Sequence, residues 1–122
     1  MKYWLIGLVC LGLTACFGED MQSAPQYWQG IEFTVEIRPT PPKAGVNEVL
    51  VVATRPHRIG EYNLLVSIRM NENDSWIQSI QDSHTGIFRR GLAMQAGPQI
   101  LWVRVERENK QTVLKFPLNV VE

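Results

Sequence analysis

The sequence has few cysteines, no excess of charge of either sign and no apolar run long enough to cross a membrane. Its two cysteines, Cys10 and Cys16, both lie near the start, so the rest of the chain has no thiol for a disulfide and depends on its core. Its 12 Lys and Arg balance its 12 Asp and Glu. This balance argues against a nucleic-acid partner, because phosphate binding needs a clustered basic surface.

The start of the chain predicts a bacterial lipoprotein signal peptide over residues 1–15. Lys2 supplies a basic start and residues 3–13 an apolar stretch, as in secretory leaders. That stretch is shorter than the roughly 20 residues of a transmembrane helix. It ends in Leu13-Thr14-Ala15-Cys16, which resembles the lipobox of bacterial lipoproteins: an apolar residue and small residues before a cysteine. The alternative is an ordinary signal peptide in which Cys16 is incidental.

The lipobox resemblance implies that the sulfur of Cys16 receives a diacylglyceryl group, that the chain is cut before it and that the new amino group is acylated. Several acyl chains make a stable membrane anchor, since each buried methylene contributes about 0.8 kcal/mol. Gram-negative lipoproteins kept at the inner membrane commonly have an aspartate next, whereas this chain has Phe17. We therefore expect the outer membrane, with the protein facing the periplasm, or the plasma membrane in a Gram-positive host.

The remaining chain predicts a tether followed by one β-domain. Residues 16–30, with no periodicity, predict a lipidated N-terminus and tether, in which Tyr27 and Trp28 either pack on the domain edge or rest at the membrane interface. Residues 31–122 contain short alternating or apolar segments separated by turn residues. The expected strands are residues 31–38, 48–54, 64–70, 76–81, 87–94, 100–106 and 112–120. About seven such strands predict an all-β, immunoglobulin-like antiparallel β-sandwich.

Several pieces of this domain form a recognisable pattern: residues 42–47 before an apolar strand, a strand ending at Met70, residues 86–88, and residues 97–105 before a last alternating strand. In their order and spacing these pieces resemble the FixH-like and YtkA-like families of small, membrane-tethered β-sandwich domains. The resemblance implies copper handling or assembly of haem-copper oxidases. The chain differs from the FixH-like proteins in having a lipid anchor in place of a transmembrane helix. It also lacks the clustered His and Met stretches that would carry copper.

The candidate copper ligands after the leader are two histidines and three methionines: His57, His84, Met21, Met70 and Met94. In a meander, the loops with the two histidines follow strands of the same direction and would lie at the same end of the sandwich. Imidazoles bind copper and zinc, and thioethers bind Cu(I). Two histidines alone make an incomplete site, however, and the methionines at 70 and 94 fall at strand ends pointing the other way. Ordinary surface histidines are the alternative.

No motif predicts catalysis. The adjacent residues Asp82, Ser83 and His84 have the types of a catalytic triad, but neighbours on one turn cannot form its geometry. The chain also contains no nucleophile elbow, phosphate-binding glycine loop or His-Glu-x-x-His motif. We therefore expect a non-enzymatic accessory or interaction module with an envelope protein as partner.

Strand edges and one tryptophan predict where a partner would bind. Residues 87–94 and the last strand are expected at sheet edges, which can pair with a partner strand. Arg89, Arg90 and Pro117 lie in these strands, although such residues also blunt edges. Trp102 lies opposite the apolar stripe of its strand, so it is either a core residue of a second face or an exposed anchor for a partner.

Overall fold

The computed structural model describes residues 23–122. The predicted signal peptide, Cys16 and Met21 lie outside these residues. The elements are β1 (Gln26–Trp28), β2 (Ile31–Arg38), β3 (Gly45–Arg55), the 3₁₀ helix η1 (Pro56–Arg58), β4 (Ile59–Gly60), β5 (Leu65–Arg69), β6 (Ile77–Gln78), β7 (Ile80–Gln81), β8 (Ile87–Met94), β9 (Gly97–Arg107) and β10 (Lys110–Val120). The described part of the chain has no helix that is long and apolar enough to span a membrane.

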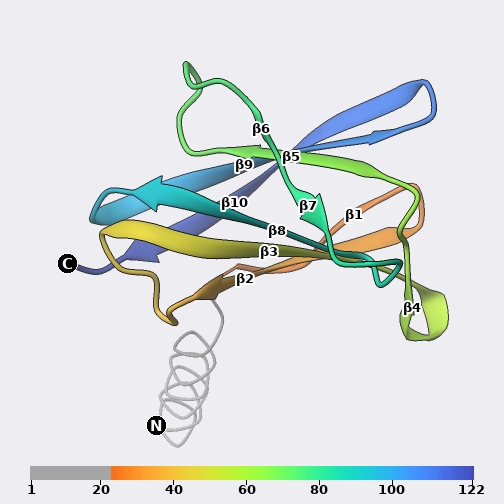
Figure 1. The fold of residues 1–122 in the computed structure, drawn as a ribbon, viewed down its shortest axis with the longest axis horizontal. Coiled ribbons are helices and arrows are strands. Elements are labelled where there is room, and N and C mark those ends of the chain that lie inside the picture. Colours follow the sequence, from red (N-terminus) through yellow and green to blue (C-terminus); the bar gives the residue numbers. More distant parts are fainter. Residues whose placement is uncertain (1–22) are drawn as a thin grey trace, which may run out of the picture.

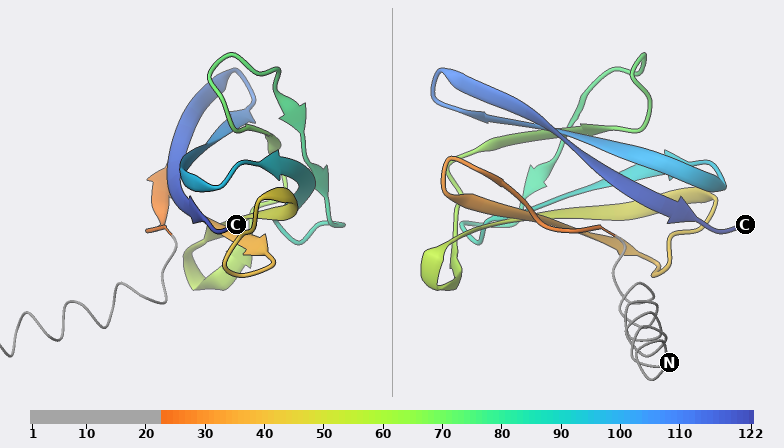
Figure 2. Two further views of the ribbon diagram at one scale, coloured as in Figure 1. Left: turned by 90° about the vertical axis from the view of Figure 1, so that its left-hand side faces the viewer. Right: turned by 180° about the vertical axis from the view of Figure 1, so that it is seen from behind.

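The strands form two sheets that pack face to face (Figures 1 and 2). The six-stranded sheet has the order β1-β2-β3-β8-β7, with β4 also paired to β3, and the four-stranded sheet has the order β10-β9-β5-β6. In immunoglobulin letters, β2-β3-β8-β7 corresponds to A-B-E-D and β10-β9-β5 to G-F-C, and β6 adds a short strand beside C that the constant-type arrangement lacks. The predicted all-β, immunoglobulin-like sandwich is confirmed.

Alternation along the strands determines which side chains fill the core. In β9, Leu101, Val103 and Val105 are fully buried, whereas Trp102 and Arg104 are only partly buried. Because successive side chains of a strand point to opposite faces, the tryptophan and the arginine lie on the outside of the four-stranded sheet. Burial of each large apolar side chain contributes about 1.5–3 kcal/mol. The core therefore stabilises a domain whose described residues contain no cysteine.

Residues 76–81, predicted as one strand, form two short strands in different sheets. β6 pairs with β5 in the four-stranded sheet, and β7 pairs with β8 in the six-stranded sheet. Ser79, between them, is buried, and its amide donates to the carbonyl of Val66 at 2.8 Å. β6 and β7 have the same residue types, an isoleucine followed by a glutamine, so the sequence contains no signal for the change from one sheet to the other.

Part of the predicted tether is folded onto the domain. β1 pairs with β2, and Trp28 packs against the core. Of the two alternatives for Trp28, the structure therefore has the one in which it packs on the edge of the domain. Tyr27 is exposed, and its hydroxyl donates to a carboxylate oxygen of Glu32 at 2.8 Å. This hydrogen bond raises the pKa of Tyr27, because the phenolate cannot donate it.

Both strands expected at sheet edges are partly covered. β10 is the last strand of the four-stranded sheet, but residues 23–28, which we call the strap, lie beside it. The hydroxyl of Ser23 donates to the backbone carbonyl of Pro117 at 2.9 Å, and the side-chain amide of Gln26 donates to the backbone carbonyl of Lys115. β8 pairs with β7 only through Phe88 and Arg89, so residues 90–94 form the open part of that edge.

Candidate interaction face

The outer face of the four-stranded sheet carries a row of cationic and tryptophan side chains. Lys115 of β10, Trp102 of β9 and Arg69 of β5 are cross-strand partners in register. The Nζ atom of Lys115 lies 4.5 Å from the centroid of the Trp102 ring, and the Cζ atom of Arg69 lies 5.2 Å from it. Because these cations come from the strands on either side of β9, they bracket the indole of Trp102.

A second tryptophan extends this row. Trp76, just before β6, has the Cζ atom of Arg69 at 4.1 Å from its ring centroid and that of Arg104 at 4.9 Å. Cation–π contacts within about 6 Å contribute about 0.5–1 kcal/mol each at exposed sites. We call this set the ladder: Lys115, Trp102, Arg69, Trp76 and Arg104. It holds three cations at fixed positions on one face.

The ladder leaves cationic groups available for contact with anions. A stacked guanidinium uses its flat face and can still donate hydrogen bonds from its terminal N–H groups, and for Arg69 and Arg104 only those groups can reach an outside anion, because the Nε atoms are buried. Arg69 uses one donor on the carbonyl of Asp74 at 3.2 Å, and Arg104 lies 3.5 Å from a carboxylate oxygen of Glu106. Within residues 23–122, Lys115 forms no ion pair. Since Lys115 and Arg69 already lie over the indole of Trp102, the face favours anionic groups over stacked sugars or bases.

An apolar hollow of about 510 Å³ adjoins the ladder at Trp102. It lies where β5 and β10 end and β9 begins, and Ile100 in its wall is 44% exposed. The lining residues are Met70, Asn71, Glu72, Pro98, Gln99, Ile100, Trp102, Pro117 and Leu118. Exposed apolar surface therefore lies directly beside the cations of the ladder, with Trp102 common to both.

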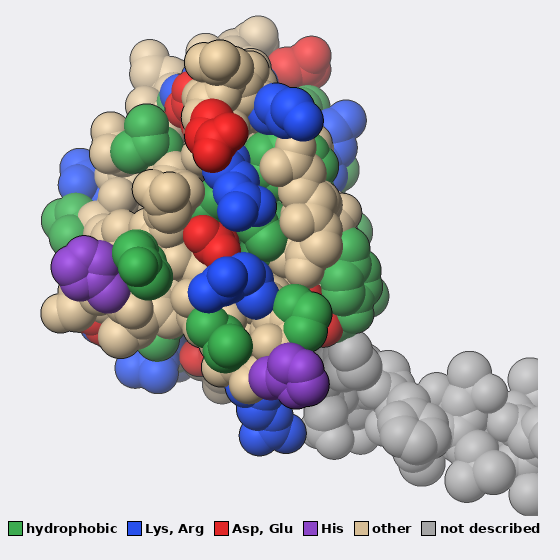
Figure 3. Space-filling model, turned by 90° about the vertical axis from the view of Figure 1, so that its right-hand side faces the viewer, with side chains coloured by type: hydrophobic (Ala, Val, Ile, Leu, Met, Phe, Trp, Pro, Cys, Tyr) green, Lys and Arg blue, Asp and Glu red, His purple; other side chains and the backbone are tan. Residues whose placement is uncertain are grey.

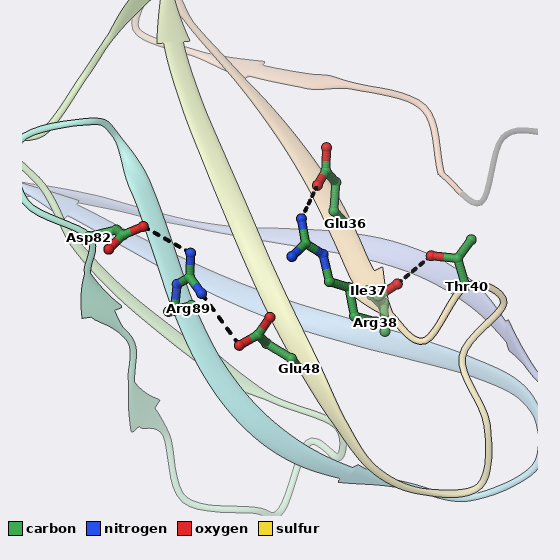
Figure 4. A network of polar contacts seen from close by, with 7 residues as sticks. All are labelled: Glu36, Ile37, Arg38, Thr40, Glu48, Asp82 and Arg89. Carbon is green, nitrogen blue, oxygen red and sulfur yellow. Dashed lines mark hydrogen bonds and ion pairs between the residues drawn. The ribbon is translucent and has the colours of Figure 1, made fainter.

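The predicted contact residues lie on different sheets. Trp102 is in the ladder, half-buried by its neighbours. Arg89 lies on β8 of the six-stranded sheet, where its guanidinium pairs with Asp82 at 2.9 Å and Glu48 at 3.6 Å (Figure 4). Arg90, the next residue of β8, is exposed. The arginines of β8 therefore belong to a different surface from the tryptophan.

The predicted histidine ligands are at the same end of the sandwich but do not meet. Figure 3 looks at this end and has both histidines on it, apart from each other. His57 is exposed in η1, whereas His84, between β7 and β8, packs edge-on against the ring of Tyr62 at 4.9 Å between centroids. Met70 and Met94 are buried in the core. Across residues 23–122, no group of three His, Cys, Asp or Glu side chains is arranged to hold a metal ion.

Four members of the ladder were not expected from the sequence: Arg69, Trp76, Arg104 and Lys115. The alternation that identifies Trp102 as outward-facing also applies to Arg104 and Lys115. What the sequence does not contain is the register of β5 against β9, which brings Arg69 beside the tryptophan.

The likeness to the FixH-like and YtkA-like families depends on turns and core positions that many sandwich domains share. It therefore remains a prediction from the sequence. Comparison with models of known protein families, with curated proteins and with solved structures gave no match.

Proposed function

We propose that the protein is a lipid-anchored, periplasm-facing envelope protein that acts as a non-enzymatic interaction module, with the outer face of the four-stranded sheet as its contact surface. The ladder is the observation that supports this best. It places two tryptophans and three cations on the outside of a sheet. Tryptophan and arginine are enriched at interfaces and at their energetic hot spots.

The proposed location is supported by the sequence around Cys16. Its lipobox-like residues predict an acylated N-terminus at the membrane surface. The first described residue, Ser23, follows seven positions later, and a chain of that length spans at most about 25 Å. A domain attached in this way would remain close to the membrane, where a contact surface acts at high local concentration.

The alternative is a copper-handling or haem-copper oxidase assembly protein with His57 and His84 as ligands. Its support is the location of both histidines at the same end of the sandwich (Figure 3). However, they come from separate loops, and the ring of His84 contacts that of Tyr62. We therefore favour the interaction module.

Photo-crosslinking in cells tests the proposed contact surface. A benzoylphenylalanine replaces Val113, which is exposed on β10 and pairs in register with Arg104 of the ladder. The matched control replaces Val52, a valine on the outer face of the six-stranded sheet. We expect crosslinked adducts with a protein or lipid of the envelope from position 113 and few from position 52. Trp102→Ala should reduce the yield of adducts from position 113 severalfold. Equal yields from both positions, or none from position 113, would contradict the proposal.

A further inference from the structure

We infer that the outer face of the four-stranded sheet docks on the anionic surface of the membrane that holds the lipid anchor. This inference rests on the proposed function, because it names what the same face contacts: the phosphate groups of phospholipid headgroups. It is supported by where the chain joins the domain, by two cations of the ladder, Arg69 and Lys115, that form no ion pair within residues 23–122, and by the apolar surface beside them.

The strap attaches the anchor side of the chain to the margin of this face. Ser23 donates to the carbonyl of Pro117, and the side chain of Pro117 lines the apolar hollow. Gln26 donates to the carbonyl of Lys115, whose ammonium group lies over Trp102. Since Cys16 precedes Ser23 by only seven residues, the acylated residue would lie within about 25 Å of Ser23 at the margin of this face.

The two sheet faces differ in how many of their cations are free of carboxylate partners, and docking on anionic lipid requires free cations. On the four-stranded sheet, Arg104 lies 3.5 Å from a carboxylate oxygen of Glu106, whereas Arg69 and Lys115 have no carboxylate partner within residues 23–122. On the six-stranded sheet, Arg38 pairs with Glu36, and Arg89 pairs with Glu48 and Asp82 (Figure 4). Ammonium and guanidinium groups form strong, charge-assisted hydrogen bonds with phosphate. The face next to the strap is therefore the one that complements anionic lipid.

Apolar and aromatic side chains on the same face suit the boundary between headgroups and acyl chains. Ile100 is 44% exposed and Val113 is 40% exposed. Trp102, which lies between Ile100 and Arg104 on the outer face of β9, has an indole of the kind that concentrates at headgroup level. These side chains are on strands and not on a protruding loop, so the expected contact is shallow.

A shallow contact is sufficient because the anchor has already brought the domain to the membrane. A short flexible linker gives an effective concentration in the millimolar range. Docking can therefore be too weak for a free domain to bind vesicles and still orient the tethered one. Its strength should fall with ionic strength, because salt screens exposed charges.

The test uses the full lipidated chain reconstituted in vesicles. An environment-sensitive fluorescent amino acid replaces Val113 or, as the control on the other sheet, Val52. In phosphatidylcholine vesicles with about 30% phosphatidylglycerol, we expect a blue-shifted emission at position 113 and its quenching by a headgroup spin label, with no change at position 52. Vesicles of phosphatidylcholine alone, or a fivefold rise in salt, should reduce the quenching at position 113 severalfold.

A charge-reversal pair makes the test specific to the ladder. Lys115→Glu should reduce the quenching severalfold. Lys110→Glu makes the same charge change at the start of β10, next to the β9–β10 turn. It should leave the quenching within about 20% of the original value, since single exposed charges away from a contact have small effects. Both lysines are exposed, so neither variant is expected to unfold. Equal effects of the two variants, equal quenching at positions 113 and 52, or independence of phosphatidylglycerol would overturn the inference.

Failure of the anchor and failure of the docking are distinguishable. If mass analysis finds no acyl groups on Cys16, the proposed anchor fails. Coupling the Cys16 thiol of a chain beginning there to a maleimide lipid then recreates the same tether, and the quenching still decides the docking. If the lipidated chain gives no quenching but position 113 crosslinks to a protein in cells, the face serves a protein partner and the membrane inference is overturned.

Discussion

Trp102 depends on residues from neighbouring strands for its position. Lys115 and Arg69 bracket its ring, and Arg69 in turn contacts Trp76. Each of these contacts requires the correct pairing of β10, β9 and β5. The same side chains that form the proposed contact surface therefore also contribute to the stability of the four-stranded sheet.

Trp102→Ala should lower the free energy of unfolding by about 2 kcal/mol, because it removes half-buried aromatic surface and cation–π contacts. Trp102→Phe keeps an aromatic ring between the two cations and should cost less than about 1 kcal/mol. Urea denaturation followed by circular dichroism measures both values. An unchanged midpoint for the alanine variant would contradict the ladder as a stabilising element.

Gly86 permits a close crossing at the end of the sandwich that carries the histidines. Its φ is +80°, and a Cβ there would lie 2.6 Å from the carbonyl oxygen of Ala53 and 2.8 Å from the amide of Glu61. Backbone atoms cannot move aside easily, so Gly86→Ala should cost more than about 3 kcal/mol or prevent folding. Gly97→Ala is the control, since φ is +107° but the space around it is open. It should cost only the backbone strain of alanine, about 1–3 kcal/mol in thermal denaturation, and equal losses would contradict the role of the crossing.

At the scale of elements, the strap closes the side of the sandwich where β2 and β10 would otherwise be exposed edges. It pairs with β2 through β1 and bonds to two carbonyls of β10. Exposed edges are templates for association with other chains. The strap thus connects the proposed anchor to the domain and also protects two strands.

Deleting residues 23–28 should lower the melting temperature by several degrees and cause self-association that increases with protein concentration. Light scattering during size-exclusion chromatography measures the association. The control is a Ser23→Ala and Gln26→Ala double variant, which keeps β1 and should lose about 1–2 kcal/mol without associating. A deletion variant that remains monomeric and equally stable would show that the edges need no cover.

The sequence pattern predicts elements well where residue types alternate or where a run is bounded by turn residues. β2 and β8 have the predicted bounds, residues 31–38 and 87–94. β1 was missed because three residues carry too little periodicity. Alternation is enough to place Arg104 and Lys115 on the same face as Trp102, but the position of Arg69 is not predicted, because the register of β5 on β9 depends on contacts between distant parts of the chain.

At the scale of the whole molecule, the start of the strap at Ser23 and the histidines are at opposite ends of the sandwich, whereas Tyr27 at the other end of the strap lies close to η1. The described chain begins near the C-terminal end of β10, whereas η1 and the β7–β8 turn are at the other end (Figure 1). A domain docked through the four-stranded sheet would lie flat. Its six-stranded sheet, with Arg89 on the outer face, would then face away from the membrane.

Copper should bind only weakly at the histidine end. Two imidazoles on separate loops are fewer ligands than copper sites normally use, so titration of the chain lacking residues 1–16 should give no affinity tighter than about micromolar. Isothermal titration calorimetry with Cu(II), and with Cu(I) under reducing conditions, measures this. A tighter site that His57→Ala or His84→Ala removes would support the copper-handling alternative.

Both the proposed function and the docking on membrane depend on lipid at Cys16. The most direct measurement is the intact mass of the mature protein, combined with membrane fractionation of the original chain and of Cys16→Ser. We expect a mature chain that begins at Cys16, carries a diacylglyceryl group and an additional acyl chain, and is found in the membrane fraction. We also expect the serine variant to remain unprocessed. A mature chain that begins elsewhere, or a free Cys16 thiol on a protein released from membranes, would contradict the proposed anchor.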